Sequence, residues 1–156
     1  MLQHRGQDAA GMVVCEPSGK LNSRKSKGYV RDVFQQTHMN NLQGNIGIGH
    51  VRYPTAGGVG KEFAQPMYVN TPYGISLAHN GNLTNSKKLA AELFHAERRQ
   101  INTESDSEVL LNIFALELSK QEAVFPKPKD FFAAVEKTHL RINGAYAVVA
   151  LITGYG

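Results

Sequence analysis

The sequence has 156 residues, enough to bury one hydrophobic core but too few for two ordinary domains. Hydrophobic residues make up 42% of the chain and charged residues 19%, which excludes a disordered or low-complexity protein. The formal net charge of +4 raises nucleic acid as a possible partner, but charge alone does not decide it.

The cysteine content and the apolar runs indicate the cellular compartment of the protein. Cys15 is the single cysteine, which excludes an intrachain disulfide and a cysteine-based metal cluster and fits a reducing compartment. The longest apolar run, Ala145 to Ile152, is far shorter than the roughly 20 residues of a membrane span. We therefore expect a cytoplasmic protein with no membrane partner.

The first half of the chain predicts strands. Met12–Cys15 and the residues from Lys20 onward are separated by Glu16-Pro17-Ser18-Gly19, which predicts a hairpin. A further strand is expected over 45–53, ended by Pro54. The segments 67–70 and 75–79 flank Thr71-Pro72-Tyr73-Gly74, and predict a second hairpin.

The second half predicts helices and a last strand. A helix capped by Thr84 or Asn85 is expected to run to about Arg98, with Leu89, Leu93 and Phe94 as its apolar stripe. Ser105 to Glu108 fits a capping box before a second helix, and Pro126 and Pro128 precede a third over 130–140. The segment 144–153 is expected to be a buried strand, so the order predicts an α+β fold with a mainly antiparallel sheet. Because the chain starts and stops abruptly, we also expect a fragment of a longer domain.

Asn80-Gly81 admits two interpretations. The dipeptide is a strong hairpin-turn signal, because both residues tolerate positive φ. Alternatively, the Asn side-chain N–H and the Gly backbone N–H can stabilise a developing negative charge together, as an oxyanion hole does. The dipeptide alone does not choose between them.

Arg52 and Asp106 suggest a clamp for an α-amino acid. Arg52 ends the expected strand 45–53, where its planar guanidinium can hold a carboxylate or form a surface ion pair. Asp106 can serve the helix dipole of the second helix or receive a substrate ammonium group. Together they would hold the two charged groups of one amino acid.

Other motifs have structural interpretations. The six histidines lack metal-binding spacing, so no metal site is expected, and His4, His50 and His79 are interpreted as hydrogen-bonded structural residues. Cys15 is interpreted as a small buried hydrophobe. The basic segment 20–31 is interpreted as a solvated hairpin face rather than a nucleic-acid site.

Several segments together resemble a known family. These are Leu2-Gln3-His4-Arg5-Gly6-Gln7-Asp8-Ala9-Ala10-Gly11, Gly47 to Gly57, Ala64-Gln65-Pro66, Leu77 to Leu83 and Ser105-Asp106-Ser107-Glu108. They resemble the glutaminase domain of the amidophosphoribosyltransferase family, a class II glutamine amidotransferase of the N-terminal-nucleophile type. The sequence Arg-Tyr-Pro-Thr-Ala-Gly at 52–57 favours this family over glucosamine-6-phosphate synthase.

The resemblance implies a four-layer αββα sandwich that hydrolyses glutamine to glutamate and ammonia. The ammonia would be used to make phosphoribosylamine from phosphoribosyl pyrophosphate in purine biosynthesis. Asn80 and Gly81 would form the oxyanion hole, and Arg5 and Gly6 would support the region of the mature N-terminus. Glutamine would be bound by Arg52, Tyr53, Thr55, Gly81 and Asp106.

The resemblance also implies what this chain does not contain. The family's nucleophile is an N-terminal cysteine, and Cys15 matches an ordinary strand position instead. We therefore expect residues 1–156 to be a class II glutamine amidotransferase domain without its N-terminal cysteine segment or the phosphoribosyltransferase domain, and to be inactive alone. No cofactor is expected in this segment, Mg²⁺ is expected only in the transferase domain, and the full-length protein is expected to be a homotetramer.

Three alternatives stay open. The chain could be a catalytically dead module that binds glutamine or a protein partner. It could belong to another class II amidotransferase, such as glucosamine-6-phosphate synthase. Nucleic-acid binding through the basic segment 20–31 is the third alternative, supported only by charge.

Overall fold

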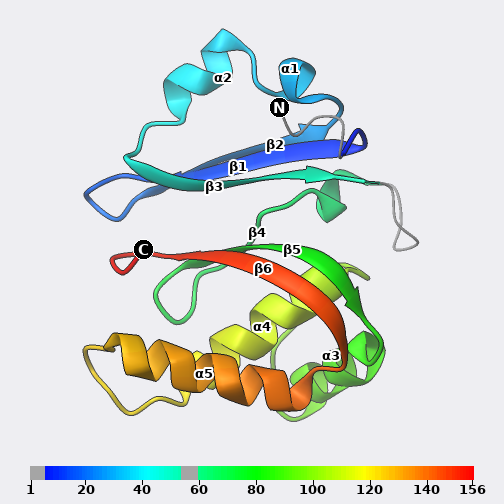
Figure 1. Cartoon of the computed structure of the whole chain (residues 1–156), viewed down its shortest axis with the longest axis vertical. Coiled ribbons are helices and arrows are strands. Elements are labelled where there is room, and N and C mark those ends of the chain that lie inside the picture. The colour runs from blue at the N-terminus through cyan, green and yellow to red at the C-terminus, as the bar shows by residue number, and fades with distance from the viewer. Residues whose placement is uncertain (1–5, 54–59) are drawn as a thin grey trace.

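The computed structural model describes residues 6–53 and 60–156. Two three-stranded antiparallel sheets lie face to face, with short helices outside one sheet and three longer helices outside the other (Figure 1). The expected α+β class and the four-layer αββα arrangement are therefore confirmed.

The first sheet has the strand order β2-β1-β3, with β1 at Ala9–Cys15, β2 at Leu21–Lys27 and β3 at Ile46–Arg52. The expected hairpin of β1 and β2 and the strand before Arg52 are confirmed, while Pro54 lies outside the described residues. Between β2 and β3, helices α1 (Val30–Val33) and α2 (Gln36–Asn41) were not expected, because they are too short to show a helical period.

The second sheet has the order β4-β5-β6, with β4 at Met67–Val69, β5 at Ile75–Leu83 and β6 at Gly144–Ile152. A short 3₁₀ helix, η2 (Lys61–Phe63), precedes β4. The expected hairpin of β4 and β5 is confirmed, and Gly74 at its turn has a φ of +65°.

Strand β5 is longer than expected, and Asn80-Gly81 is not a hairpin turn. β6 pairs with β5 along its whole length, including Asn80 with Ala147 and Gly81 with Tyr146. At Gly81 φ is +155°, and a Cβ there would collide with the Ala145 carbonyl oxygen and the Tyr146 Cα. The hairpin interpretation is therefore wrong: glycine is needed because β6 lies so close.

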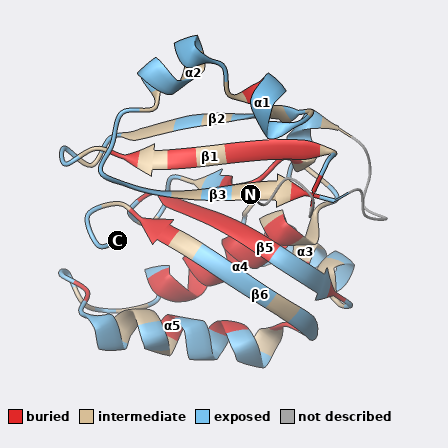
Figure 2. Cartoon of the chain, turned by 45° about the horizontal axis from the view of Figure 1, so that its top comes forward, coloured by how far each residue is buried: buried red, intermediate tan, exposed pale blue. Residues whose placement is uncertain are grey.

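The expectation of a buried last strand is also wrong. Within β6 only Leu151 and Ile152 are buried, and Val148 and Val149 are about half exposed. β6 lies at the edge of its sheet among the described residues, so much of its apolar surface faces outward (Figure 2). An uninterrupted apolar run shows strand propensity, but it does not show where in the sheet the strand lies.

The helical layer consists of α3 (Ser86–His95), α4 (Asp106–Ser119) and α5 (Pro128–Arg141). α4 is buried over almost its whole length, because it lies against β4 and β5 and is flanked by α3 and α5 (Figure 2). α5 begins at Pro128, two residues earlier than expected, because proline suits the first turn of a helix. α3 ends at His95 rather than near Arg98, whose φ of +55° is not helical.

The helix caps differ in detail from the expected ones. Asn85 is the N-cap of α3, but its side chain binds the backbone of Arg141 and Asn143 instead of its own helix. Ser105 caps α4 by accepting a hydrogen bond from the Ser107 N–H at 3.3 Å. Glu108 completes no capping box, since its carboxylate accepts from the backbone of residues 102 and 103.

The apolar stripe of α3 is confirmed at Leu89 and Leu93 but not at Phe94. Both leucines are buried in the main core, whereas Phe94 is 54% exposed and packs its edge on His95. Successive residues of a helix are about 100° apart, so Leu93 and Phe94 cannot both point at α4.

Adjacent substitutions on α3 test this packing. Leu93→Ala removes a fully buried side chain and should lower the free energy of unfolding by about 2–5 kcal/mol. Phe94→Ala is the matched control and should change it by less than about 0.5 kcal/mol, because the ring is mainly in solvent. Urea unfolding followed by circular dichroism measures both, and equal losses would contradict the assignment.

Candidate functional site

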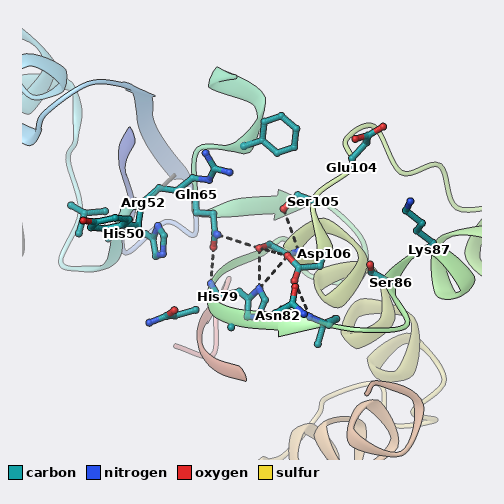
Figure 3. A pocket seen from close by; sticks show the side chains of 18 residues that line it. His50, Arg52, Gln65, His79, Asn82, Ser86, Lys87, Glu104, Ser105 and Asp106 are labelled. Atoms are coloured by element: carbon teal, nitrogen blue, oxygen red, sulfur yellow. Dashed lines mark hydrogen bonds and ion pairs between the residues drawn. The ribbon is translucent and has the colours of Figure 1, made fainter. Parts of the chain in front are cut away.

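A cavity of about 790 Å³ opens where the ends of β3 and β5 meet the start of α4. Its walls include Arg52 from β3 and Asp106 from α4 (Figure 3). Asn80 and Gly81 of β5 also line it. These four residues, all singled out from the sequence, therefore line one cavity, although more than fifty positions separate the first from the last.

Arg52 ends β3 with its side chain buried. Asp8 forms an ion pair with its guanidinium, and both side chains are less than 10% exposed. The ring of Phe63 lies 5.4 Å from the guanidinium carbon. An arginine has five N–H donors in a fixed plane, and Asp8 orients this guanidinium at the wall of the cavity.

Gly6 lies directly behind Arg52. A Cβ at Gly6 would come within 2.6 Å of the Val51 carbonyl carbon and 2.9 Å of the Arg52 nitrogen. The chain can pass this close to β3 only with glycine at this position. Gly6 thus supports the strand end that carries Arg52.

Asp106 is the first residue of α4. Its Oδ2 accepts a hydrogen bond from the Leu83 N–H at 3.0 Å, which connects the start of the helix to the end of β5. The helix dipole favours a carboxylate here, and a quarter of the side chain is exposed toward the cavity. The carboxylate can therefore bind a ligand cation while it keeps its structural hydrogen bond.

A buried hydrogen-bond network adjoins Asp106, and sequence reasoning gave its members no role in the site. Gln65 accepts from the His79 N–H at 2.6 Å and donates to the Ser107 hydroxyl at 3.1 Å, and that hydroxyl lies 3.0 Å from the His79 Nδ1 (Figure 3). All three residues are more than 90% buried. Gln65 and Ser107 lie in segments that carry the family resemblance, which is the only signal that could have found them.

Burial controls the charge of the two histidines at the cavity. It lowers the pKa of His79 below the ordinary value of 6.5, although the Asp106 carboxylate opposes this change. It also lowers the pKa of His50, with further contributions from His79 and Arg52. Both rings are therefore neutral near pH 7, and the 3.7 Å approach of His79 to Asp106 is a polar contact rather than an ion pair.

The remaining predicted residues are placed only in part. Tyr53 lines the cavity and is 58% exposed. Thr55, Arg5 and His4 lie outside the described residues. Of the basic segment, Lys25 and Lys27 are exposed on β2, as expected for a solvated hairpin face, and the Lys25 ammonium also donates to the Pro66 carbonyl at 3.0 Å.

Cys15 lies away from the cavity. It is buried at the end of β1 opposite Ala9, the residue that pairs with Arg52. Six residues of strand separate these two ends, which corresponds to about 20 Å. The interpretation of Cys15 as a buried hydrophobe is confirmed, and the residue lies at the opposite end of the strand from Arg52.

Two features are absent from the described residues. Within residues 6–53 and 60–156, no three His, Cys, Asp or Glu side chains are grouped as a metal site requires. Over the same residues, no helix combines the length and the apolar character needed to cross a bilayer.

Comparisons of this sequence with known proteins agree with one another. The profile of the glutamine amidotransferase domain family matches residues 31–135. Amidophosphoribosyltransferases of Pseudomonas aeruginosa and Escherichia coli are 60% and 56% identical to this chain over all of its 156 residues, which cover 31% of each relative. The chain therefore spans about a third of the length of these curated relatives.

Solved structures agree with the sequence matches. One is described as the allosteric regulatory enzyme of purine biosynthesis; it has a TM-score of 0.77 and 34% identity, and the match covers 96% of this chain and 30% of that one. Another is described as the glutamine phosphoribosylpyrophosphate amidotransferase from B. subtilis complexed with ADP and GMP, with a TM-score of 0.76 and 31% identity. That match covers 97% of this chain and 30% of the other.

The two buried histidines predict a pH dependence of stability. Since their pKa values are lowered on folding, the unfolded chain binds more protons once the pH falls below about 6.5. The free energy of unfolding should be greatest above that pH and decrease from pH 7 to 5.5. Urea unfolding at several pH values measures this decrease.

A pair of variants assigns the effect to the cavity. His79→Asn should flatten the pH dependence, because one of the two groups with a lowered pKa is removed. His95→Asn, at an exposed position of α3, should keep the wild-type slope. A wild-type stability that rises on acidification from pH 7 to 5.5 would refute the prediction.

Proposed function

The chain belongs to the glutamine amidotransferase domain family, and we propose that its cavity binds glutamine and orients the side-chain carboxamide for hydrolysis. The observation that carries the proposal is the grouping of Arg52, Asp106 and Asn80-Gly81 around one cavity. A cationic, an anionic and a neutral hydrogen-bonding group there match the three polar ends of glutamine.

Each group has a chemical role in this proposal. The Arg52 guanidinium binds the α-carboxylate, and Asp106 binds the α-ammonium group. The Asn80 side chain and the Gly81 N–H stabilise the oxyanion formed when a nucleophile attacks the carboxamide carbon. Tyr53 and Thr55 complete the glutamine pocket, and Arg5 and Gly6 support the neighbouring N-terminal region.

The nucleophile in the proposed reaction is an N-terminal cysteine of the family, which these 156 residues do not supply. Its thiolate would form a thioester with the glutamyl group and release ammonia, and water would then free glutamate. The cysteine's own α-amino group would transfer the protons. The described chain contributes the binding pocket and the oxyanion hole.

The whole protein's activity follows from its relatives as a further proposal. Their name indicates that the ammonia is transferred to phosphoribosyl pyrophosphate, which gives phosphoribosylamine for purine biosynthesis. A separate transferase domain would perform this step with Mg²⁺, while the present segment needs no cofactor. We propose a cytoplasmic homotetramer as the working form. The comparisons favour this function over glucosamine-6-phosphate synthesis.

Asp106→Asn tests the glutamine site. The substitution keeps an acceptor for the Leu83 N–H but removes the charge that binds the α-ammonium group. We expect the dissociation constant for glutamine to rise about 10- to 100-fold, since a hydrogen bond to a charged group contributes about 1.5–3 kcal/mol. Isothermal titration calorimetry measures the change.

Two controls make this result specific. Glutaramate, which is glutamine without its α-amino group, should bind the wild type and Asp106→Asn equally. Asp130→Asn makes the same substitution at the start of α5, away from the cavity, and should not affect glutamine binding. If Asp106→Asn lowered the affinity for both ligands alike, the proposed role of its charge would be wrong.

Cys15→Ala tests whether the single cysteine takes part. We expect no change in glutamine binding, no glutamate release from these 156 residues, and no reaction of Cys15 with an electrophilic glutamine analogue. Intact-protein mass spectrometry measures the labelling, and iodoacetamide added after unfolding provides the positive control for the thiol. Stoichiometric labelling of the folded wild type that disappears in Cys15→Ala would overturn the assignment.

A further inference from the structure

One edge of β5 carries three backbone donors beyond the end of β4. The pairing of β5 with β6 is unbroken from Ile75 to Leu83, so alternate residues direct their N–H groups to the side away from β6. β4 covers that side only from Ile75 to Leu77. Among the residues that the structure describes, the N–H groups of His79, Gly81 and Leu83 therefore follow one another along an edge without a neighbouring strand.

Side chains take the place of the strand at the two outer donors. The Gln65 Oε1 accepts from the His79 N–H at 2.6 Å, and the Asp106 Oδ2 accepts from the Leu83 N–H at 3.0 Å. The Gly81 N–H lies between them and borders the cavity. The two outer bonds hold the strand on both sides of this donor.

Gln65 and Asp106 are also connected to each other through Ser107. The Ser107 hydroxyl accepts from the Gln65 Nε2 at 3.1 Å, lies 3.0 Å from the His79 Nδ1, and belongs to the residue that follows Asp106 in α4. Because Gln65, His79 and Ser107 are more than 90% buried, breaking any of these bonds would leave a polar group without water. The connected hydrogen bonds therefore form a rigid frame between β5 and the start of α4.

We propose that Gln65 and Ser107 are positioning residues that fix the separation between the Gly81 N–H and the Asp106 carboxylate, and thereby select glutamine over asparagine. The proposal rests on the proposed function, in which these two groups bind opposite ends of the substrate. Glutamine has two methylene groups between its α-carbon and its carboxamide, and asparagine has one. A fixed distance between the Gly81 N–H and the Asp106 carboxylate fits the longer amino acid and not the shorter one. A difference of one methylene group typically changes selectivity by about 10- to 200-fold.

Two variants loosen the frame and leave Gly81 and Asp106 themselves unchanged, although the Ser107 hydroxyl also donates to the Asp106 Oδ1 at 3.5 Å. Gln65→Met keeps the length of the side chain but removes both of its hydrogen bonds, and Ser107→Ala removes the hydroxyl that joins Gln65 to the start of α4. Gln100→Met, the same substitution at an exposed position, is the matched control. Titrations followed by ¹H–¹⁵N NMR spectra of the 156-residue chain give the dissociation constants for L-glutamine and L-asparagine.

We expect Gln65→Met and Ser107→Ala to weaken glutamine binding by at least 10-fold and asparagine binding by less than 2-fold, so that the selectivity falls. Gln100→Met should keep the wild-type ratio. If both ligands lost affinity by the same factor in a folded variant, or if neither changed, the proposal would be overturned. If one of the two variants does not fold, the other variant still tests the proposal.

Hydrogen exchange separates this inference from the proposed function. Gln65→Met should reduce the protection of the His79 N–H by at least 10-fold without ligand, whereas Gln100→Met should leave it unchanged. If the folded wild type bound no glutamine, the proposed function would fail whatever the variants did, and selectivity through this frame would fail with it. If glutamine bound but His79 protection did not change, only the positioning role would be refuted.

Discussion

The pairing of β5 with β6 as far as Leu83 is the constraint on which the site depends. β4 ends early, so within residues 6–53 and 60–156 no strand pairs with this edge of β5 where it reaches the cavity. A strand edge with no backbone partner needs other acceptors, because buried N–H groups without them are costly. Gln65 and Asp106 provide these acceptors, and the same contacts place a carboxylate beside Gly81.

Nearby groups of opposite charge or dipole stabilise the charged side chains of the site. Asp8 balances Arg52, and the helix dipole of α4 favours Asp106. The buried histidines remain neutral instead, since their pKa values are lowered. Arg52 and Asp106 thus place a cation and an anion at the cavity, which is the charge pattern that an α-amino acid requires.

Much of this arrangement was predictable from local sequence signals. Turn residues identified both hairpins, and Leu89 and Leu93 identified the buried side of α3. Local signals failed where a distant partner decided the outcome. Asn80-Gly81 has the composition of a turn, but contacts with β6 keep it extended, and the apolar β6 is exposed because it lies at the edge of its sheet.

By itself, the sequence determined the α+β class, the family resemblance and the residue types able to bind an amino acid. Those conclusions depend on periodicity, turn chemistry and motifs, which operate over short distances along the chain. Only the tertiary structure decided that Gln65, His79 and Ser107 join in one buried network and that Asp8 orients Arg52. Hydrogen bonds between residues dozens of positions apart require the two sheets and α4 to be packed together, and no local pattern encodes that geometry.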